Sequence, residues 1–257
     1  MRANRRLWKK AQGNRIAELI YDTSMGISEN NSFKIKGYCE PFCGMLGVYE
    51  HMISLFDDKK IKYKAGDMNP YIIKLWLGLQ KGWKPPTSCS KSTYLKYKEN
   101  DDDSVKAIFC GYACPLRSRF RGTYMQGRNI KLQAEHCREI GKKVKNVSFS
   151  NNDYRQYSKL KGYIIYCDPP YENTACEYHC GDIKNDSFDT KKFIDWCLEM
   201  SKHNIIFVTE YKKLPTRTFK KLWTKGKDKL YVVNTKYNIK KSKTPRKSIK
   251  KRSRIKL

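Results

Sequence analysis

The stretch GYIIYCDPPY, residues 162–171, decides the fold of this chain. Its first six residues form the most apolar short run of the sequence and predict a buried strand. Asp168 follows directly, so we expect it in the loop at the carboxyl end of that strand. In open α/β sheets, ligands bind at this edge. The stretch therefore predicts an α/β sheet with a ligand site that begins at Asp168.

Apolar, β-forming runs alternate with helical patterns on both sides of this stretch, as is typical of an α/β fold with a mostly parallel sheet. Asn69 is expected to cap a helix that starts with Pro70. We predict further strands at residues 33–40, 61–66, 144–149, 204–208 and 230–233, and helices at residues 48–56, 70–79 and 189–200, with another helix from Ile16.

Two segments depart from this alternation. Between residues 81 and 143, Gly, Pro, Ser and three consecutive aspartates replace clean periodicity, which indicates an insert. Residues 236–257 contain eleven Lys or Arg and no acid, so we predict a disordered basic tail. Residues 1–80 and 144–235 are then expected to form the main domain.

The composition is strongly basic, with 54 Lys and Arg against 25 Asp and Glu and a formal net charge of +29. Such a surface attracts polyanions, so nucleic acid is the expected partner. An anionic membrane is the alternative, but no apolar run approaches the length of a spanning helix. The N-terminus has no signal-peptide pattern, so we expect an intracellular protein that is not secreted. We also expect a monomer or a weak dimer.

The ten cysteines are expected to be thiols in a reducing compartment. Three pairs share a Cys-x3-Cys spacing: Cys39 and Cys43, Cys110 and Cys114, Cys176 and Cys180. Zinc is the alternative, since His179 adjoins the last pair. The pairs do not match the usual spacings of zinc ligands, which favours buried thiols and predicts no metal.

The DPPY quartet has the chemistry to hold an amino group on an aromatic ring. The carboxylate of Asp168 and the carbonyl of Pro169 can accept both amino hydrogens, and the ring of Tyr171 can stack on a base. Pro169 and Pro170 stiffen the loop. The alternative is a stiff turn in which Asp168 caps a helix, so the quartet alone leaves both interpretations open.

The segment GYCEPFCGMLGV, residues 37–48, resembles the first motif of the Dam-like (D12 class) N6-adenine DNA methyltransferases, which include phage and viral members. With DPPY, the resemblance covers roughly residues 10–215, in the order of the family's alpha group. It implies a Rossmann-like S-adenosylmethionine-dependent methyltransferase sheet, mostly parallel with one antiparallel strand. It also implies that residues 81–143 form a mainly helical DNA-recognition lobe. Leu46 stands where the family usually has glycine.

The resemblance implies a set of residues that bind S-adenosylmethionine, the expected methyl donor. Asp67 matches the acid that binds ribose hydroxyls, although its charge would also favour the helix that follows. Arg15 matches a weaker element near the N-terminus, for which a basic surface patch is the alternative. The full set is Arg15, Pro41, Phe42, Gly44, Gly47, Asp67, Asp153 and Asp168.

The insert contains a segment, residues 109–124, that is similar to part of the family's recognition lobe. Its arginines suit phosphate or guanine contacts, and a solvated basic face is the alternative for each. The residues expected to contact double-stranded DNA are Arg117, Arg119, Arg121, Tyr124 and Arg128.

The implied reaction is methylation of adenine N6 in a short DNA sequence. A paired amino group cannot meet a methyl donor in line, so the base must be flipped out of the duplex. Two alternatives share this chemistry: methylation of cytosine N4 in DNA, and of adenine N6 in RNA. A third alternative, motivated by Leu46, is a basic DNA-binding protein that keeps the methyltransferase fold with impaired catalysis.

Overall fold

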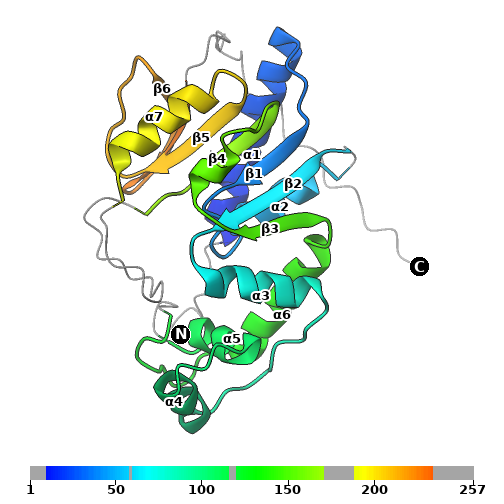
Figure 1. Ribbon diagram of the computed structural model, residues 1–257, viewed down its shortest axis with the longest axis vertical. Helices are drawn as coiled ribbons and strands as arrows, with labels where there is room; N and C mark the ends of the chain where they lie inside the picture. The colour runs from blue at the N-terminus through cyan, green and yellow to red at the C-terminus, as the bar shows by residue number, and fades with distance from the viewer. Residues whose placement is uncertain (1–9, 58–59, 116–119, 171–187, 234–257) are drawn as a thin grey trace.

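The computed structural model describes residues 10–57, 60–115, 120–170 and 188–233. A seven-stranded sheet in the order β3-β2-β1-β4-β5-β7-β6 forms its centre (Figure 1). Its strands are β1 (Gly37–Glu40), β2 (Lys62–Asp67), β3 (Val147–Asn151), β4 (Tyr163–Cys167), β5 (Ile205–Glu210), β6 (Phe219–Lys225) and β7 (Asp228–Val233).

Five of these strands, β3, β2, β1, β4 and β5, pair in parallel. Strand β7 runs antiparallel to both of its neighbours, β5 and β6. The predicted fold class, a mostly parallel Rossmann-like sheet with one antiparallel strand, is therefore confirmed. The sequence analysis missed β6, in which only Phe219 is fully buried and three lysines interrupt the apolar pattern.

The helices are α1 (Lys10–Asn31), α2 (Tyr49–Leu55), α3 (Pro70–Gln80), α4 (Lys91–Glu99), α5 (Val105–Ala113), α6 (Ile130–Lys143) and α7 (Thr190–Met200), with a short 3-10 helix, η2 (Tyr154–Tyr157). The predicted cap of α3 is confirmed, because the Asn69 side chain accepts a 3.0 Å hydrogen bond from the Tyr71 N–H. Not one of the described helices is long and apolar enough to cross a membrane.

Strand β4 shows how the sheet buries both of its faces. All five of its residues are buried, and successive side chains point to opposite sides. Ile164 and Tyr166 join the larger apolar cluster, which includes residues of α1, α2, α3, α5 and α6. Ile165 and Cys167 join the smaller cluster, which includes α7 and η2. Burial on both faces explains why the strand reads as one unbroken apolar run.

The described part of the insert is mainly helical, and its buried apolar residues belong to the larger cluster. Helices α4 and α5 lie beyond α3, at the lower end of the molecule in Figure 1. Trp83 and Phe109 pack edge to face at 6.1 Å between ring centres. A β-carbon on Gly78 of α3 would lie 2.9 Å from Val105 of α5, so these two helices are in close contact. Residues 88–128, which contain α4, α5 and their flanking loops, are called the lobe below.

A buried carboxylate links α2 to α6, the helix that leads from the insert back to the sheet. Glu50 of α2 is 2% exposed, and the Nε2 atoms of His51 and of His136 from α6 each lie 3.5 Å from its Oε1. Burial acts to raise the pKa of Glu50. The hydrogen bond and charge of His136, with the charges of His51 and Lys143, outweigh burial and lower the pKa below its ordinary value of 4.5.

The substitution Glu50→Gln is expected to lower the free energy of unfolding at pH 7 by about 1–3 kcal/mol, because it removes one partner from a buried polar cluster. A lowered folded pKa means that the wild-type contribution is present above about pH 4.5 and is lost as the pH falls through the folded pKa. Urea denaturation at several pH values measures this. If the difference in stability between the wild type and Glu50→Gln stayed constant down to pH 3, the lowered pKa of Glu50 would be contradicted. Glu18→Gln, at an exposed ion pair, is the control and should change stability little.

Candidate active site

Acidic side chains gather at the carboxyl edge of the parallel strands. Glu40 ends β1, Asp67 ends β2, Glu210 ends β5, and Asp168 directly follows β4. The register places β1 between β2 and β4, and β5 beside β4, so these four ends are neighbours on one edge. This is the position predicted for the site from the sequence.

The Asp67 side chain links the loop from β1 to α2 with the turn that follows β2. The Gly44 N–H donates to Asp67 Oδ2 at 3.0 Å, and the Asn69 N–H donates to Asp67 Oδ1 at 2.9 Å. Burial raises the pKa of Asp67, and these two bonds oppose the rise. Each oxygen of Asp67 thus accepts one backbone bond and keeps a second lone pair for a ligand.

Gly44 and Leu46 of this loop both have positive φ, at 44° and 58°. A β-carbon on Gly44 would meet nothing within 4 Å, so the loop has open space beside it. The Leu46 side chain is instead fully buried in the larger cluster. Leu46 therefore adopts the left-handed conformation that usually selects glycine, and burial of a leucine, about 2 kcal/mol, offsets the conformational cost of about 1–2 kcal/mol. Although Leu46 departs from the family pattern, its backbone keeps the conformation that glycine would adopt there.

Helix α1 approaches this loop through Gly13. A β-carbon on Gly13 would lie only 1.9 Å from the Gly47 carbonyl oxygen, so the two backbones are in contact. Arg15 is two positions further along, about 200° around the helix, and points away from that contact. Its side chain is 55% exposed and pairs with Glu18 at 3.3 Å. The geometry therefore favours the alternative for Arg15, a basic surface on α1. Gly13 is the residue of α1 that contacts the loop after β1.

Asp168 is exposed at the edge and has acidic and phenolic neighbours. Behind it, Glu40 is 2% exposed, and the Tyr38 hydroxyl donates to Glu40 Oε1 at 2.5 Å. Burial raises the pKa of Glu40 well above its ordinary value; the Tyr38 bond opposes this, and the charge of Asp168 adds to it. Pro169 is buried and Pro170 exposed. Tyr171 lies outside the described residues.

Tyr211, just past the end of β5, is a neighbour of Asp168 that the sequence analysis did not assign to the site. Burial raises the pKa of its hydroxyl, and the charges of Asp228 and Asp168 raise it further. Asp228 Oδ2 in turn accepts a 2.6 Å hydrogen bond from Gln12 Nε2 of α1. Helix α1, β7 and the end of β5 therefore meet next to Asp168.

Phe42 joins the loop after β1 to the segment after β3, and Asp153 orders that segment. The ring of Phe42 stacks on Tyr154 at 5.5 Å and meets the edges of Phe188 and Phe193. Asp153 caps η2: its Oδ1 accepts hydrogen bonds from the Arg155 N–H at 2.9 Å and from Arg155 Nε at 2.6 Å.

Asn152 lies between these parts of the site. Its Oδ1 is buried, and no donor in the described part of the chain hydrogen-bonds to it. A β-carbon on Gly66 would come within 2.9 Å of this oxygen, so Asn152 faces the end of β2. A buried acceptor without a partner is costly, and a bound ligand with a donor would satisfy it.

Arg121, one of the residues predicted to contact DNA, makes its contacts within the lobe. The side chain of Arg121 is 8% exposed. It forms an ion pair with Asp101, donates to the Asp102 carbonyl oxygen at 2.5 Å and lies over the Phe120 ring. These contacts favour a structural role for Arg121 in the lobe, and the prediction that it contacts DNA stays a prediction.

The other predicted DNA contacts are only partly described. The Tyr124 hydroxyl donates to the Cys89 carbonyl oxygen at 3.2 Å, and Arg128 Nε donates to the Ala113 carbonyl oxygen at 3.1 Å. Both side chains are half-buried. Arg117 and Arg119 lie outside the described residues.

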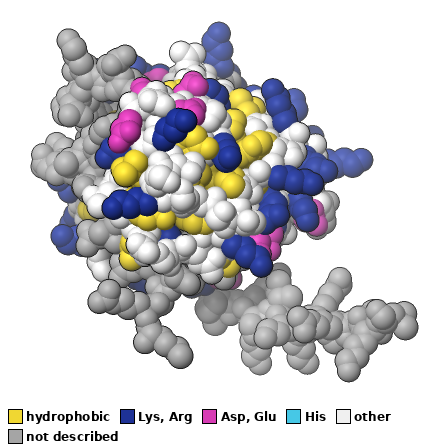
Figure 2. Space-filling model, turned by 90° about the horizontal axis from the view of Figure 1, so that it is seen from below, with side chains coloured by type: hydrophobic (Ala, Val, Ile, Leu, Met, Phe, Trp, Pro, Cys, Tyr) yellow, Lys and Arg dark blue, Asp and Glu magenta, His cyan; other side chains and the backbone are white. Residues whose placement is uncertain are grey.

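The surface of the lobe and the adjoining end of α6 carry exposed lysines. Figure 2 views the molecule from the lobe end of Figure 1 and shows Lys and Arg side chains spread over this face, with acidic side chains gathered at one edge of it. The sequence analysis missed them because they lie outside the arginine-rich segment. The described lysines that are exposed here are Lys91, Lys96, Lys98, Lys106 and Lys131.

The sheet order, the loop after β1 and the acidic edge define a Rossmann-like α/β fold with a ligand-binding edge. The model of the D12 class N6 adenine-specific DNA methyltransferases matches residues 110–239, half of the chain. The chain belongs to this family. The match includes Asp153 and DPPY but begins well after the loop that follows β1, which the structure places at the same sheet edge as Asp168. Assignment to the alpha group or to a viral type stays a prediction.

Two structures of the rRNA methyltransferase aviRa from Streptomyces viridochromogenes are similar to the chain. They share 12% and 13% identity with it, each with a TM-score of 0.40. The alignments cover 84% and 86% of this chain and 84% of each of those chains. Comparison with curated proteins gives no match.

Proposed function

We propose that this chain transfers a methyl group from S-adenosylmethionine to N6 of adenine in DNA. The observation that carries the proposal is the position of Asp168. It is an exposed carboxylate that follows the most apolar strand of a D12-family chain, at the same edge as the loop after β1. Ligands of open α/β sheets bind at this edge.

The residues at the edge fit S-adenosylmethionine. Open space beside Gly44 lets a ligand approach the backbone of the loop, which includes Pro41 and Gly47. Asp67 keeps lone pairs for ribose hydroxyls, and the buried Asn152 Oδ1 offers an acceptor to an adenine or amino group. These residues, with Phe42 and Asp153, would hold the cofactor, which supplies a methyl group already activated by a sulfonium.

The chain's own contribution to the reaction is positioning. The Asp168 carboxylate and the Pro169 carbonyl accept the two hydrogens of the adenine amino group and so aim its nitrogen lone pair at the methyl donor. Tyr171 stacks on the flipped base. Burial raises the pKa of Glu40 and so disfavours its charged form, whereas the Asp168 carboxylate is exposed at this point of the edge.

Affinity for DNA is assigned to the lobe lysines and to the basic tail. Phosphate contacts by Lys and Arg release counterions and make binding depend on salt. Lys91, Lys96 and Lys98 of α4 are exposed on the lobe. Residues 240–257 contain ten further Lys or Arg and lie beyond both the family match and the described residues.

Deletion of residues 240–257 is expected to weaken DNA binding and to reduce the slope of log K against log salt by several phosphate contacts, at about 0.9 per contact. Fluorescence anisotropy of a labelled duplex at several salt concentrations measures this. A variant of full length with the ten Lys and Arg changed to Gln is the matched control and should behave like the deletion. Unchanged affinity and slope would indicate that the tail serves as a nuclear import signal instead.

Product analysis tests the proposed reaction. The protein is incubated with methyl-labelled S-adenosylmethionine and either duplex DNA or RNA, and each product is digested to nucleosides. We expect label in N6-methyladenine from DNA. Label in N4-methylcytosine or only in RNA would select one of the two alternatives that share the chemistry. If calorimetric titration with the cofactor gave no heat, the DNA-binding protein with impaired catalysis would be favoured.

A further inference from the structure

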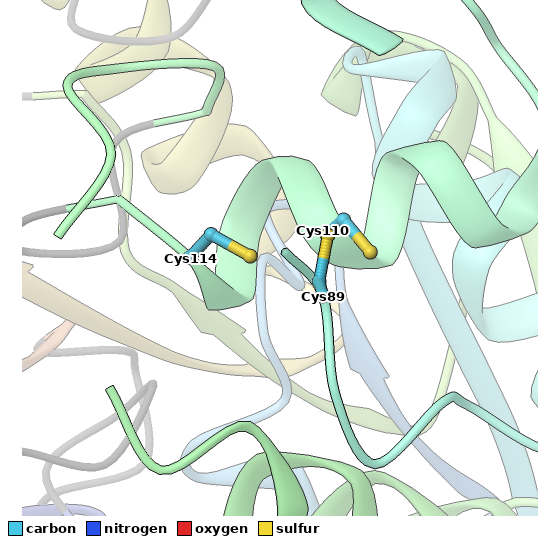
Figure 3. A group of neighbouring side chains, drawn as sticks. All are labelled: Cys89, Cys110 and Cys114. Carbon is cyan, nitrogen blue, oxygen red and sulfur yellow. The ribbon is translucent and has the colours of Figure 1, made fainter. Parts of the chain in front are cut away.

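Three buried cysteines converge inside the lobe, away from the acidic edge. The sulfur atoms of Cys89, Cys110 and Cys114 all lie within 4.8 Å of one another. Figure 3 shows Cys110 and Cys114 on α5 and at its C-terminal end, and Cys89 approaching from the segment that precedes α4. Cys89 is 9% exposed, and the other two are fully buried.

The local structure explains why these thiols meet. Cys110 and Cys114 are four residues apart on one turn, joined by a 3.0 Å hydrogen bond from the Cys114 N–H to the Cys110 carbonyl oxygen. That spacing puts both side chains on one face of the helix. Cys89 is held against this face by the 3.2 Å bond from the Tyr124 hydroxyl to its carbonyl oxygen. The spacing of cysteine pairs does not reveal this trio, because Cys89 is isolated in the sequence.

We propose that Cys89, Cys110 and Cys114 bind one zinc ion that cross-links the lobe. Zinc–sulfur bonds are about 2.3 Å long, so two sulfurs on a tetrahedral zinc are about 3.8 Å apart. The widest separation here needs to close by only about 1 Å to reach this geometry. This proposal departs from the sequence-based expectation of buried thiols without a metal for the Cys110 and Cys114 pair.

The chemistry of the three ligands favours zinc over harder cations. Thiolates select zinc and copper(I), whereas magnesium, calcium and manganese prefer oxygen ligands. On binding, three thiols lose their protons to solvent and three zinc–sulfur bonds form, which leaves the fourth tetrahedral position to water.

Basic groups around the cluster match the charge of such a site. Zinc with three thiolates carries one net negative charge. The charge of Lys106 acts on Cys89, and Arg128 acts on Cys114 while its Nε holds the Ala113 carbonyl oxygen at the end of α5. The ion would therefore fasten the start of α4 to the end of α5, next to the exposed lysines of the lobe.

The full-length chain, expressed with zinc and purified under reducing conditions, tests this proposal. Elemental analysis is expected to give about one zinc per chain. Replacement by cobalt(II) is expected to give thiolate charge-transfer and tetrahedral d–d absorption bands. A strong chelator should lower the melting temperature, and added zinc should restore it.

Variants locate the site. Cys89→Ser and Cys114→Ser are expected to lose most of the bound zinc, and Cys137→Ser, which alters another fully buried thiol, should keep it. The cobalt spectrum of the wild-type chain tests the proposal even if the variants fail to fold. Reduced wild-type protein without zinc or cobalt bands, a Cys110–Cys114 disulfide in place of metal, or equal zinc loss in Cys137→Ser would each overturn the proposal.

Discussion

The substitution Asp168→Ala is expected to reduce kcat for methyl transfer by at least about 10²–10³-fold, the usual cost of removing one oriented polar group from the reacting atoms. The structure gives the physical reason. Asp168 is exposed at the carboxyl end of β4, while the neighbouring carboxyl of Glu40 is buried and its pKa raised. Glu40 therefore does not replace the lost anionic acceptor. Single-turnover methylation with labelled cofactor measures the effect.

DNA affinity and stability should change little in this variant, because Asp168 is exposed and lies outside both apolar clusters. Asp195→Ala is the matched control. It removes the same charge from an exposed acid of α7 that pairs with Lys191 at 3.2 Å, and it should keep full activity. If Asp168→Ala unfolded the chain or abolished DNA binding, the quartet would be a structural turn instead of a catalytic pocket.

The substitution Gly13→Ala is expected to have the largest effect on stability, a loss of about 3 kcal/mol. The added carbon would lie 1.9 Å from the Gly47 carbonyl oxygen, which belongs to the backbone and cannot rotate away. Helix α1 must move from the loop, so affinity for S-adenosylmethionine should fall as well. Chemical denaturation and calorimetry measure the two effects.

Gly26→Ala provides the control in the same helix. A β-carbon at Gly26 would meet nothing within 4 Å, so alanine there only removes the cost of glycine in a helix. Stability should rise by about 0.5–1 kcal/mol. Equal effects at the two positions would show that α1 does not depend on close contact with the loop.

The centre of the fold could be predicted from the sequence because local patterns determine it. Strand β4 is buried on both faces, so its apolar run is unbroken, and Asp168 necessarily follows it at the sheet edge. Asn69 and Pro70 marked the start of α3 through capping chemistry that needs only neighbouring residues. Strand β6 was missed because an edge strand with one fully buried residue has no such pattern.

What could not be predicted depends on contacts between distant residues. Arg121 looks like a surface cation until Asp101 and the Asp102 carbonyl, some twenty residues earlier, are placed beside it. Gly13 has no visible role until the Gly47 carbonyl lies against it. The trio of Cys89, Cys110 and Cys114 likewise arises from the packing of the segment before α4 against α5. In each case the local sequence is compatible with a simpler interpretation.

Sequencing that detects modified bases, applied to DNA from cells that express either the wild-type chain or Asp168→Ala, tests the central claim most directly. It reports the identity of the base and its sequence context together. We predict N6-methyladenine within a short recurrent sequence in the wild-type sample and none above background in the variant. Unmodified adenine in both samples, or N4-methylcytosine in the wild-type sample, would contradict the proposed function.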